Sequence, residues 1–280
     1  MAIAEIEVRP VAGCGALIEG IDPRRAGAAE IDRIRSAIFE RGVVFLHGLK
    51  LTPEDQIAFA RRLGPIVVNR YFPKAERYPE IAKVEKTEAQ VSNIGGGWHT
   101  DHSYDQAPAM GSMLLAIETP PSGGDTLFEN LYLAYESLSP GMRALLDRIV
   151  AVHSYAAGSD PDRGYGDPNA DRDVARFPDV EHPLVRTHPE SGRNALYLSG
   201  SWLLRFRDMT EEESRPLLDF LYAHAARPEF TCRFHWTPGA LALLDNRCTQ
   251  HFAINDYSGS RRVMHRVMFG GEPPLGVRVA

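Results

Sequence analysis

The segment WHTDHSY, at positions 98–104, holds two residues whose spacing could do chemistry, His99 and Asp101. On an extended strand, residues two positions apart point to the same face, so an imidazole and a carboxylate can converge on one metal ion. A histidine followed two residues later by an aspartate also arises often by chance. This pair therefore predicts a metal site only together with a third ligand.

His251, inside the segment DNRCTQHFAINDY, can supply that ligand. Two histidines and one carboxylate form a facial triad that leaves three coordination positions open, as in non-heme Fe(II) oxygenases. A zinc hydrolase can use the same donors, but it usually brings a helical HExxH-type motif, which this sequence lacks. At this point a structural role for these histidines remains the alternative.

A pair of arginines follows His251 on the segment RVMHRVMF, which begins at Arg262. If this segment is a strand, Arg262 and Arg266 share one face and stand about 13 Å apart. Burying two arginines beside apolar neighbours costs free energy unless each guanidinium meets an anion. We therefore expect one anion on either side of the metal. The alternative is an exposed face with two solvated arginines.

The elements that must position these residues are mainly short strands. The spacing of apolar residues predicts a helix over 30–41, a strand at Val43–Leu46 and a helix from Thr52, its cap, to Arg62. Further helices are expected at 131–149 and 210–226, and Pro- and Gly-containing turns separate the remaining segments, which favours an antiparallel sandwich or barrel. The other predicted strands are Met113–Ile117, Thr126–Phe128, Ile149–His153, Leu184–Thr187, Ala195–Leu198, Phe230–His235, Leu241–Leu244 and Arg262–Phe269.

Two long segments beside these motifs are predicted to be active-site lids. Residues 87–97 end in three glycines just before Trp98, and residues 156–181 are rich in Gly, Pro and Asp. Loops of this length inside one domain are usually functional or disordered, and their positions favour lids.

The composition excludes several classes of partner. The chain has 280 residues, 44% hydrophobic and 24% charged, with a net charge of −6, so general electrostatic attraction to nucleic acid or an acidic membrane is not expected. Three dispersed cysteines argue against a disulfide framework and a structural zinc site. With no signal peptide or membrane-spanning stretch apparent, we expect a cytoplasmic protein.

Four motifs together resemble the taurine dioxygenase-like (TauD/TfdA) family of 2-oxoglutarate-dependent oxygenases: WHTDHSY at 98–104, PPSGGDTLF at 120–128, HPLVRTHPESGRNALYL at 182–198, and the block from Trp236 to Arg266. The resemblance covers nearly the whole chain. It implies a mainly β, α+β fold, with a double-stranded β-helix (jelly-roll, cupin-like) core and flanking helices in one domain over residues 1–280.

The resemblance also implies roles for individual residues. His99, Asp101 and His251 correspond to the iron ligands, while Thr126 and Arg262 correspond to residues that hold the distal carboxylate of 2-oxoglutarate. The implied cofactors are Fe(II), 2-oxoglutarate and O₂, and the implied reaction hydroxylates a substrate C–H bond with succinate and CO₂ as coproducts. The predicted substrate contacts are Arg266, Asn69, Tyr71, His102, Tyr155 and Trp202.

Several pocket residues depart from the taurine-cleaving members of that family. Asn69 stands where they carry a second anion-binding histidine, Gly95 where they carry an asparagine, and His102 where a small apolar residue is usual. These changes predict a wider pocket and a substrate other than taurine: a longer alkylsulfonate, an alkyl sulfate ester, or an aryloxy or alkyl carboxylate.

Two alternatives keep the same ligand set. The enzyme could carry out a biosynthetic desaturation or epoxidation, which differs from hydroxylation only in the substrate and its pose. A catalytically silent sensor of 2-oxoglutarate is the other alternative, and the intact ligand candidates weigh against it. We expect a small anionic substrate, no nucleic-acid or membrane partner, and a homo-oligomer, as in relatives that are dimers or tetramers.

Overall fold

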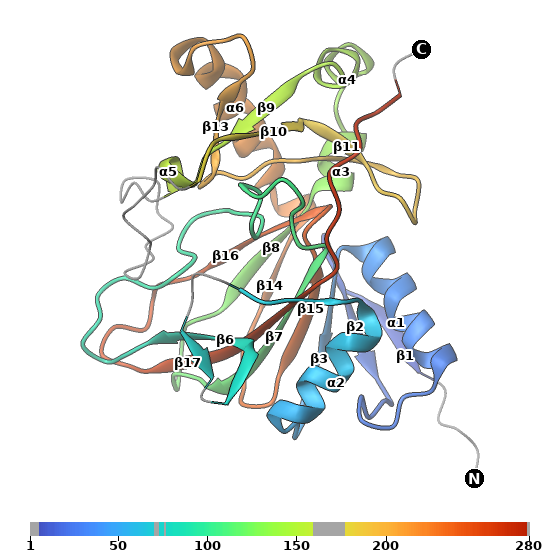
Figure 1. Cartoon of the computed structure of the whole chain (residues 1–280), viewed down its shortest axis with the longest axis vertical. Coiled ribbons are helices and arrows are strands. Elements are labelled where there is room, and N and C mark those ends of the chain that lie inside the picture. Colours follow the sequence, from blue (N-terminus) through green and yellow to red (C-terminus); the bar gives the residue numbers. More distant parts are fainter. Residues whose placement is uncertain (1–5, 70–72, 76, 159–176, 279–280) are drawn as a thin grey trace.

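Two sheets of mainly antiparallel strands pack against each other and form the centre of the molecule (Figure 1). The computed structural model describes residues 6–69, 73–75, 77–158 and 177–278. The larger sheet contains, in order, β1 (Glu7–Pro10), β2 (Ala16–Glu19), β3 (Val43–Leu46), β15 (Leu241–Asp245), β7 (Gly111–Glu118), β17 (Arg262–Phe269), β6 (Tyr78–Lys86) and β5 (Lys74–Ala75), with β4 (Ile66–Val67) paired to β17. The smaller sheet contains β14 (Thr231–Phe234), β8 (Thr126–Asn130) and β16 (Thr249–Ala253).

Apolar side chains from both sheets fill the space between them. Phe45 on β3 stacks on Phe234 of β14 with ring centroids 4.2 Å apart, and Phe128 of β8 meets Phe45 edge to face. Met264 on β17 joins the same buried cluster. The strands β16, which carries His251, and β17, which carries Arg262 and Arg266, therefore lie on opposite sides of one core.

Two helices, α1 (Ala28–Arg41) and α2 (Pro53–Leu63), cover the outer face of the larger sheet (Figure 1). Ile34 and Phe59 from these helices pack with Val44 and Leu243 from the strands. Because this sheet is buried on both faces, β3 is a continuous apolar run rather than an alternating one. The predicted cap is confirmed, since Thr52 accepts a hydrogen bond from the Asp55 N–H.

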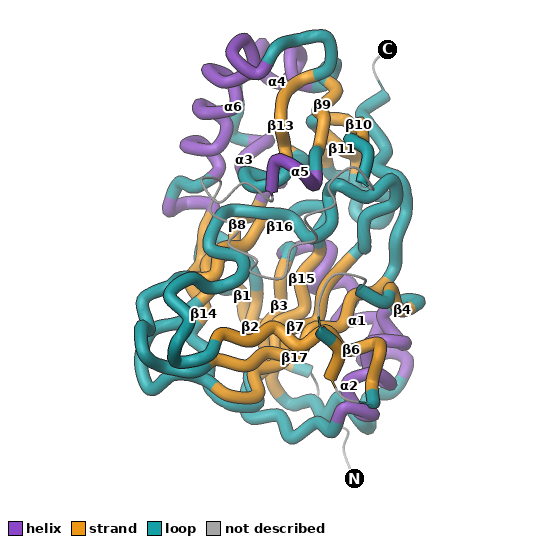
Figure 2. The backbone as a smooth tube through the Cα atoms, turned by 60° about the vertical axis from the view of Figure 1, so that its left-hand side comes forward, coloured by secondary structure: helices purple, strands orange, loops and turns teal. Residues whose placement is uncertain are grey.

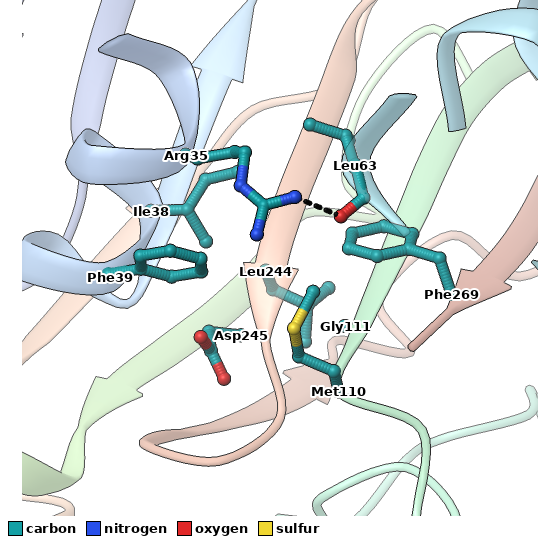
Figure 3. A pocket seen from close by; sticks show the side chains of 9 residues that line it. All are labelled: Arg35, Ile38, Phe39, Leu63, Met110, Gly111, Leu244, Asp245 and Phe269. Carbon is teal, nitrogen blue, oxygen red and sulfur yellow. Dashed lines mark hydrogen bonds between the residues drawn. The ribbon is translucent and has the colours of Figure 1, made fainter. Parts of the chain in front are cut away.

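A small cavity lies between these helices and the larger sheet (Figure 3). Arg35 reaches across it and donates a 2.7 Å hydrogen bond to the carbonyl of Leu63, which fastens α1 to the end of α2. Its lining is mostly apolar and includes none of the three predicted iron ligands. We therefore assign it to helix packing.

The remaining elements form a second layer at one end of the sheets (Figure 2). The predicted helix over 131–149 is two helices, because Ser139 caps a new one and Pro140 occupies its first turn. The elements of this layer are α3 (Leu131–Glu136), α4 (Pro140–Leu146), α5 (Tyr155–Gly158), α6 (Glu211–Ala225), the 3₁₀ turn η3 (Pro228–Phe230), and the strands β9 (Val150–His153), β10 (Val180–Pro183), β11 (Val185–Thr187), β12 (Asn194–Leu196) and β13 (Leu203–Phe206).

Candidate metal centre and active site

The structure brings together the three residues predicted to bind a metal. His251 is the third residue of β16, and it exchanges two backbone hydrogen bonds with His99, of 3.1 and 2.9 Å. The ligand atoms of His99, Asp101 and His251 all lie within 4.8 Å of one another, and all three side chains are buried. This spacing fits one small cation held by two imidazoles and a carboxylate.

Backbone contacts set the orientation of His99. Its Nδ1 lies 2.7 Å from the carbonyl of Gly97, so the Nδ1–H donates to that oxygen and the Nε2 lone pair remains for a metal. Nε2 is 3.9 Å from Oδ1 of Asp101. An imidazole fixed by a carbonyl in this way is typical of a metal ligand.

Gly95 lies against the imidazole of His99. It has φ +80°, and a Cβ at this position would lie 3.0 Å from Cε1 of His99. Only glycine adopts this backbone conformation without strain. The imidazole therefore occupies the space into which a side chain at position 95 would extend.

Asp101 is held on both of its carboxylate oxygens. Ser112 on β7 donates a 2.7 Å hydrogen bond to Oδ2, and Nη1 of Arg266 donates a 2.8 Å bond to Oδ1. Asn246 donates in turn to the Ser112 hydroxyl at 3.4 Å and to the carbonyl of Ala109 at 3.2 Å. Neither Ser112 nor Asn246 was predicted from the sequence.

The charges at the centre suit a divalent cation. Burial has the largest single effect on the pKa of Asp101 and raises it, but the Coulombic effects of Arg266 and of the neighbouring histidines together outweigh burial, so the pKa lies well below its usual value. Burial, followed by the charge of His99, lowers the pKa of His251 to about 3, and burial also lowers the pKa of His99. Two neutral imidazoles beside one carboxylate are the donor set of a mononuclear iron site, so these residues fit Fe(II).

A second group of possible ligands, His188, Asp245 and Cys248, has a different character. Arg247 donates to both oxygens of Asp245, at 2.9 and 2.7 Å, and His188 lies 2.9 Å from one of them. The guanidinium already supplies the positive charge that a metal would bring. This buried network stabilises the turn between β15 and β16. His251 lies on β16.

The predicted 2-oxoglutarate residues form a buried cationic corner. Arg262 lies beside Lys86 in the register of β17 and β6, and neither the Nε of Arg262 nor the Nζ of Lys86 has a hydrogen-bond partner among the described residues. The Lys86 ammonium lies 4.6 Å from the ring centroid of Tyr257. Trp236 donates a 2.9 Å hydrogen bond to the hydroxyl oxygen of Thr126, which orients this group. Buried cations of this kind fit a carboxylate.

The turn before Thr126 depends on glycine. Gly123 and Gly124 both have positive φ, and a Cβ on Gly123 would lie 2.5 Å from a carboxylate oxygen of Asp256. That same oxygen accepts a 2.7 Å hydrogen bond from the Gly124 N–H. The turn is thereby tied to the segment that precedes β17 and Arg262.

His102 does not continue a regular strand. Its φ is +57°, so the backbone turns directly after Asp101. Its Nε2 lies 2.9 Å from the amide nitrogen of Asn69, and its Nδ1 lies 3.1 Å from Oδ2 of Asp105. The two predicted substrate contacts Asn69 and His102 are therefore bonded to each other.

Aromatic residues line the space next to this turn. The ring centroid of Tyr104 lies 5.0 Å from that of Tyr155 and 4.6 Å from that of Trp202. A cavity of about 490 Å³ opens beside them, with Val68, His102 and Tyr104 in its wall. This volume is in the range of small-molecule sites.

The structure describes the first predicted lid and only the ends of the second. Residues 87–97 are tied to β16 and the segment after it: Asn93 donates to the carbonyl of Ala253 at 2.9 Å, and Ala253 donates to that of Gly95 at 2.8 Å. Residues 159–176, most of the second predicted lid, lie outside the described residues. So does Tyr71, one of the predicted substrate contacts.

Comparison with known proteins identifies the family. The model of the taurine catabolism dioxygenase TauD, TfdA family matches residues 7–268. The chain belongs to the TauD/TfdA family. A sulfate ester dioxygenase of Pseudomonas putida, described as alpha-ketoglutarate-dependent, is 35% identical over 281 residues, covering 98% of this chain and 92% of the relative.

Two further members of the TauD/TfdA family support this assignment. An alpha-ketoglutarate-dependent 2,4-dichlorophenoxyacetate dioxygenase of Cupriavidus pinatubonensis is 35% identical over 289 residues, covering 95% of this chain and 97% of the relative. The crystal structure of a taurine dioxygenase from Burkholderia xenovorans superposes with a TM-score of 0.82 at 35% identity, covering 97% of this chain and 93% of that one.

The family membership settles the class of enzyme. This TauD/TfdA protein is a 2-oxoglutarate-dependent non-heme iron dioxygenase that uses Fe(II), 2-oxoglutarate and O₂. The fold is mainly β, as predicted, and is similar to that of solved members. Among the described residues, no helix combines the length and apolar character that crossing a membrane requires.

Proposed function

We propose that His99, Asp101 and His251 hold Fe(II), and that the enzyme oxidises the carbon that bears the head group of a small anionic substrate. The observation that carries this proposal is the contact between Arg266 and Asp101, 2.8 Å apart. It puts an anion-binding guanidinium directly beside the metal triad. A substrate head group at Arg266 would therefore place its first carbons next to the metal.

We assign the distal carboxylate of 2-oxoglutarate to Arg262 and Thr126. When bound, Fe(II) and 2-oxoglutarate activate O₂ for oxidation of a C–H bond, with succinate and CO₂ as coproducts. Arg262 can grip a carboxylate through two N–H groups, and Thr126, oriented by Trp236, can donate one more hydrogen bond. Lys86 adds a second buried positive charge at this end of β17.

A sulfate ester is the substrate class we propose first. The Pseudomonas putida relative is named as a sulfate ester dioxygenase, and the cavity beside Tyr104 offers a partly apolar wall for an alkyl chain. Hydroxylation of R–CH₂–O–SO₃⁻ at the carbon next to oxygen gives R–CH(OH)–O–SO₃⁻. This product breaks its C–O bond to give the aldehyde R–CHO and hydrogen sulfate.

An aryloxy carboxylate is a second candidate, favoured by the aromatic cluster of Tyr104, Tyr155 and Trp202. A relative with the same 35% identity acts, by its name, on 2,4-dichlorophenoxyacetate. Stacking of an aryl group on these rings would fix its position. The two candidates differ in the head group that Arg266 would hold.

We also infer two features of architecture. The smaller and larger sheets face each other across one apolar core. This arrangement supports a double-stranded β-helix within a single domain over residues 1–280. Assembly into a homo-oligomer and a cytoplasmic location stay predictions. Size-exclusion chromatography with light scattering would test the oligomeric state.

A substrate panel tests the proposed function. The Fe(II)-loaded enzyme would be supplied with 2-oxoglutarate, O₂ and either an alkyl sulfate, an alkylsulfonate, taurine, an aryloxyacetate or a simple carboxylate of similar length. We expect the alkyl sulfate to give equal amounts of succinate, sulfate and aldehyde. Higher turnover of taurine than of every other compound would contradict the proposed substrate class, and no stimulated succinate with any compound would contradict the proposed function.

A further inference from the structure

A half-buried lysine, Lys74, lies in the same cross-strand row as Arg266. Lys74 on β5 pairs with Ala82 on β6, and Ala82 pairs with Arg266 on β17. Paired residues in an antiparallel sheet point to the same face, and two strand spacings put the Lys74 and Arg266 Cα atoms about 10 Å apart. Ala82, which lies between them, has a small side chain on the face that Arg266 uses to reach Asp101.

Among the described residues, no carboxylate pairs with the ammonium of Lys74. Its Nζ is shielded from solvent and has no hydrogen-bond partner among the described residues. Burial, followed by the charge of Arg266, lowers its pKa. A desolvated cation next to another cation is unfavourable until an anion joins them. The two oxygens of Asp101 accept from Ser112 and Arg266.

We propose that Lys74 and Arg266 together bind the anionic head group of the substrate. The inference rests on the proposed function, since it places the substrate's head group at the same site. The Arg266–Asp101 pair is close to neutral as a unit, so Lys74 supplies the positive charge that a singly charged head group would balance. Asn69, another predicted substrate contact, lies 2.9 Å from His102 through its amide nitrogen.

The geometry favours a sulfate or sulfonate over a carboxylate. Nη1 of Arg266 donates to Asp101, and the edge formed by Nε and Nη2 has two donors that suit either a carboxylate or a sulfo group. A tetrahedral sulfo group presents three oxygens in different directions, so it can accept from the guanidinium and from a compact ammonium at the same time. Selectivity between these head groups should therefore depend on Lys74.

The test measures binding separately from turnover. Hexyl sulfate would be titrated by calorimetry into enzyme loaded with 2-oxoglutarate and Mn(II), a metal that can occupy the same ligands. We expect Lys74→Met to weaken hexyl sulfate by about ten- to hundredfold, because it removes a hydrogen bond to a charged group, and Lys74→Arg to keep most of the affinity. Lys83→Met is the matched control, because Lys83 follows Ala82 on β6, faces the other side of the sheet and pairs with Glu85.

The outcomes separate the two proposals. Equal binding of hexyl sulfate by wild type and Lys74→Met, an equal loss in Lys74→Arg and Lys74→Met, or no binding by wild type would overturn the role of Lys74. Binding that depends on Lys74 without any succinate formation from the Fe(II) enzyme would support that role and contradict the proposed oxidation instead. Heptanoate, a carboxylate of similar length, would be titrated in the same way. The whole inference would be supported if Lys74→Met loses more affinity for hexyl sulfate than Lys83→Met does, and loses more affinity for hexyl sulfate than for heptanoate.

Discussion

Arg266 and Asp101, 165 positions apart in the sequence, share a buried hydrogen bond of 2.8 Å. Burial raises the pKa of Asp101, and the guanidinium makes the largest of the Coulombic contributions that together lower the pKa and keep the carboxylate charged. The same guanidinium faces the site proposed for the substrate. One residue therefore connects the proposed metal ligand with the proposed anion site.

The first prediction concerns Ser112, which holds the other oxygen of Asp101 at 2.7 Å. Ser112→Ala leaves that oxygen without its donor and frees the carboxylate to rotate, so we expect metal affinity to fall by roughly 10- to 100-fold. Calorimetric titration of the metal-free protein with Mn(II) measures this directly. The exposed Ser137→Ala is the control, and equal affinities in the two variants would show that Ser112 does not position Asp101.

The second prediction concerns Arg262 and the cosubstrate. Arg262→Met removes charged hydrogen bonds worth about 1.5–3 kcal/mol each, so the KM for 2-oxoglutarate should rise by about tenfold or more. The variant should also lose most of its preference for 2-oxoglutarate over 2-oxobutyrate, which lacks the distal carboxylate. Steady-state succinate or propionate formation gives both values, and an unchanged preference would rule out this assignment.

The third prediction separates backbone strain from contact with His99. Gly95 and Gly259 both have positive φ, but a Cβ on Gly95 would meet His99 at 3.0 Å, whereas one on Gly259 meets nothing within 4 Å. Alanine at either position should cost about 1 kcal/mol or more of unfolding free energy from strain. Only Gly95→Ala should also weaken Mn(II) binding, and equal metal affinities in both variants would contradict the role we give to this contact.

The fourth prediction concerns pH and His182, whose Nε2–H donates to the carbonyl of Asp105 at 3.0 Å. Burial lowers the pKa of His182 to about 4 in the folded protein, from about 6.5 when unfolded. The unfolded chain therefore binds a proton first, and the contribution of His182 is present above pH 6.5 and lost as the pH falls toward 4, by up to about 3 kcal/mol.

Urea unfolding of the metal-free protein between pH 4 and 7 tests this sign. His182→Gln retains a donor without a titrating group, so its unfolding free energy should fall less steeply than that of wild type over this interval. The neighbouring His153, whose pKa burial also lowers, keeps part of the slope in both proteins. Parallel curves would show that His182 does not titrate with unfolding.

Local patterns were sufficient to predict much of the fold. The run Val43–Leu46 and the Thr52 cap are strong signals, and both are confirmed. The strand β16 was not predicted, although it carries His251, because TQHFA mixes polar and apolar residues that are all largely buried. Its polar side chains find partners in distant segments, such as Glu129 for Gln250, and a single sequence does not show this pairing.

The sequence predicted which residues form the candidate site, but it did not predict the contacts between them. The spacing of His99 and Asp101 indicated a shared face, and Arg262 and Arg266 were expected on one side of a strand, which agrees with the structure. Ser112 and Lys74 carry no local signal, because their importance comes from strand register. The bond between Asn69 and His102 likewise depends on the backbone turn at His102.

The central claim is that Fe(II) and 2-oxoglutarate meet at His99, Asp101 and His251. Anaerobic addition of Fe(II) and 2-oxoglutarate tests it through the visible absorption band that arises when a 2-oxo acid chelates Fe(II). We predict the band in wild type, its loss in Asp101→Ala, and its appearance only at higher 2-oxoglutarate in Arg262→Met. A band of unchanged intensity in Asp101→Ala, at the same Fe(II) concentration, would contradict the claim.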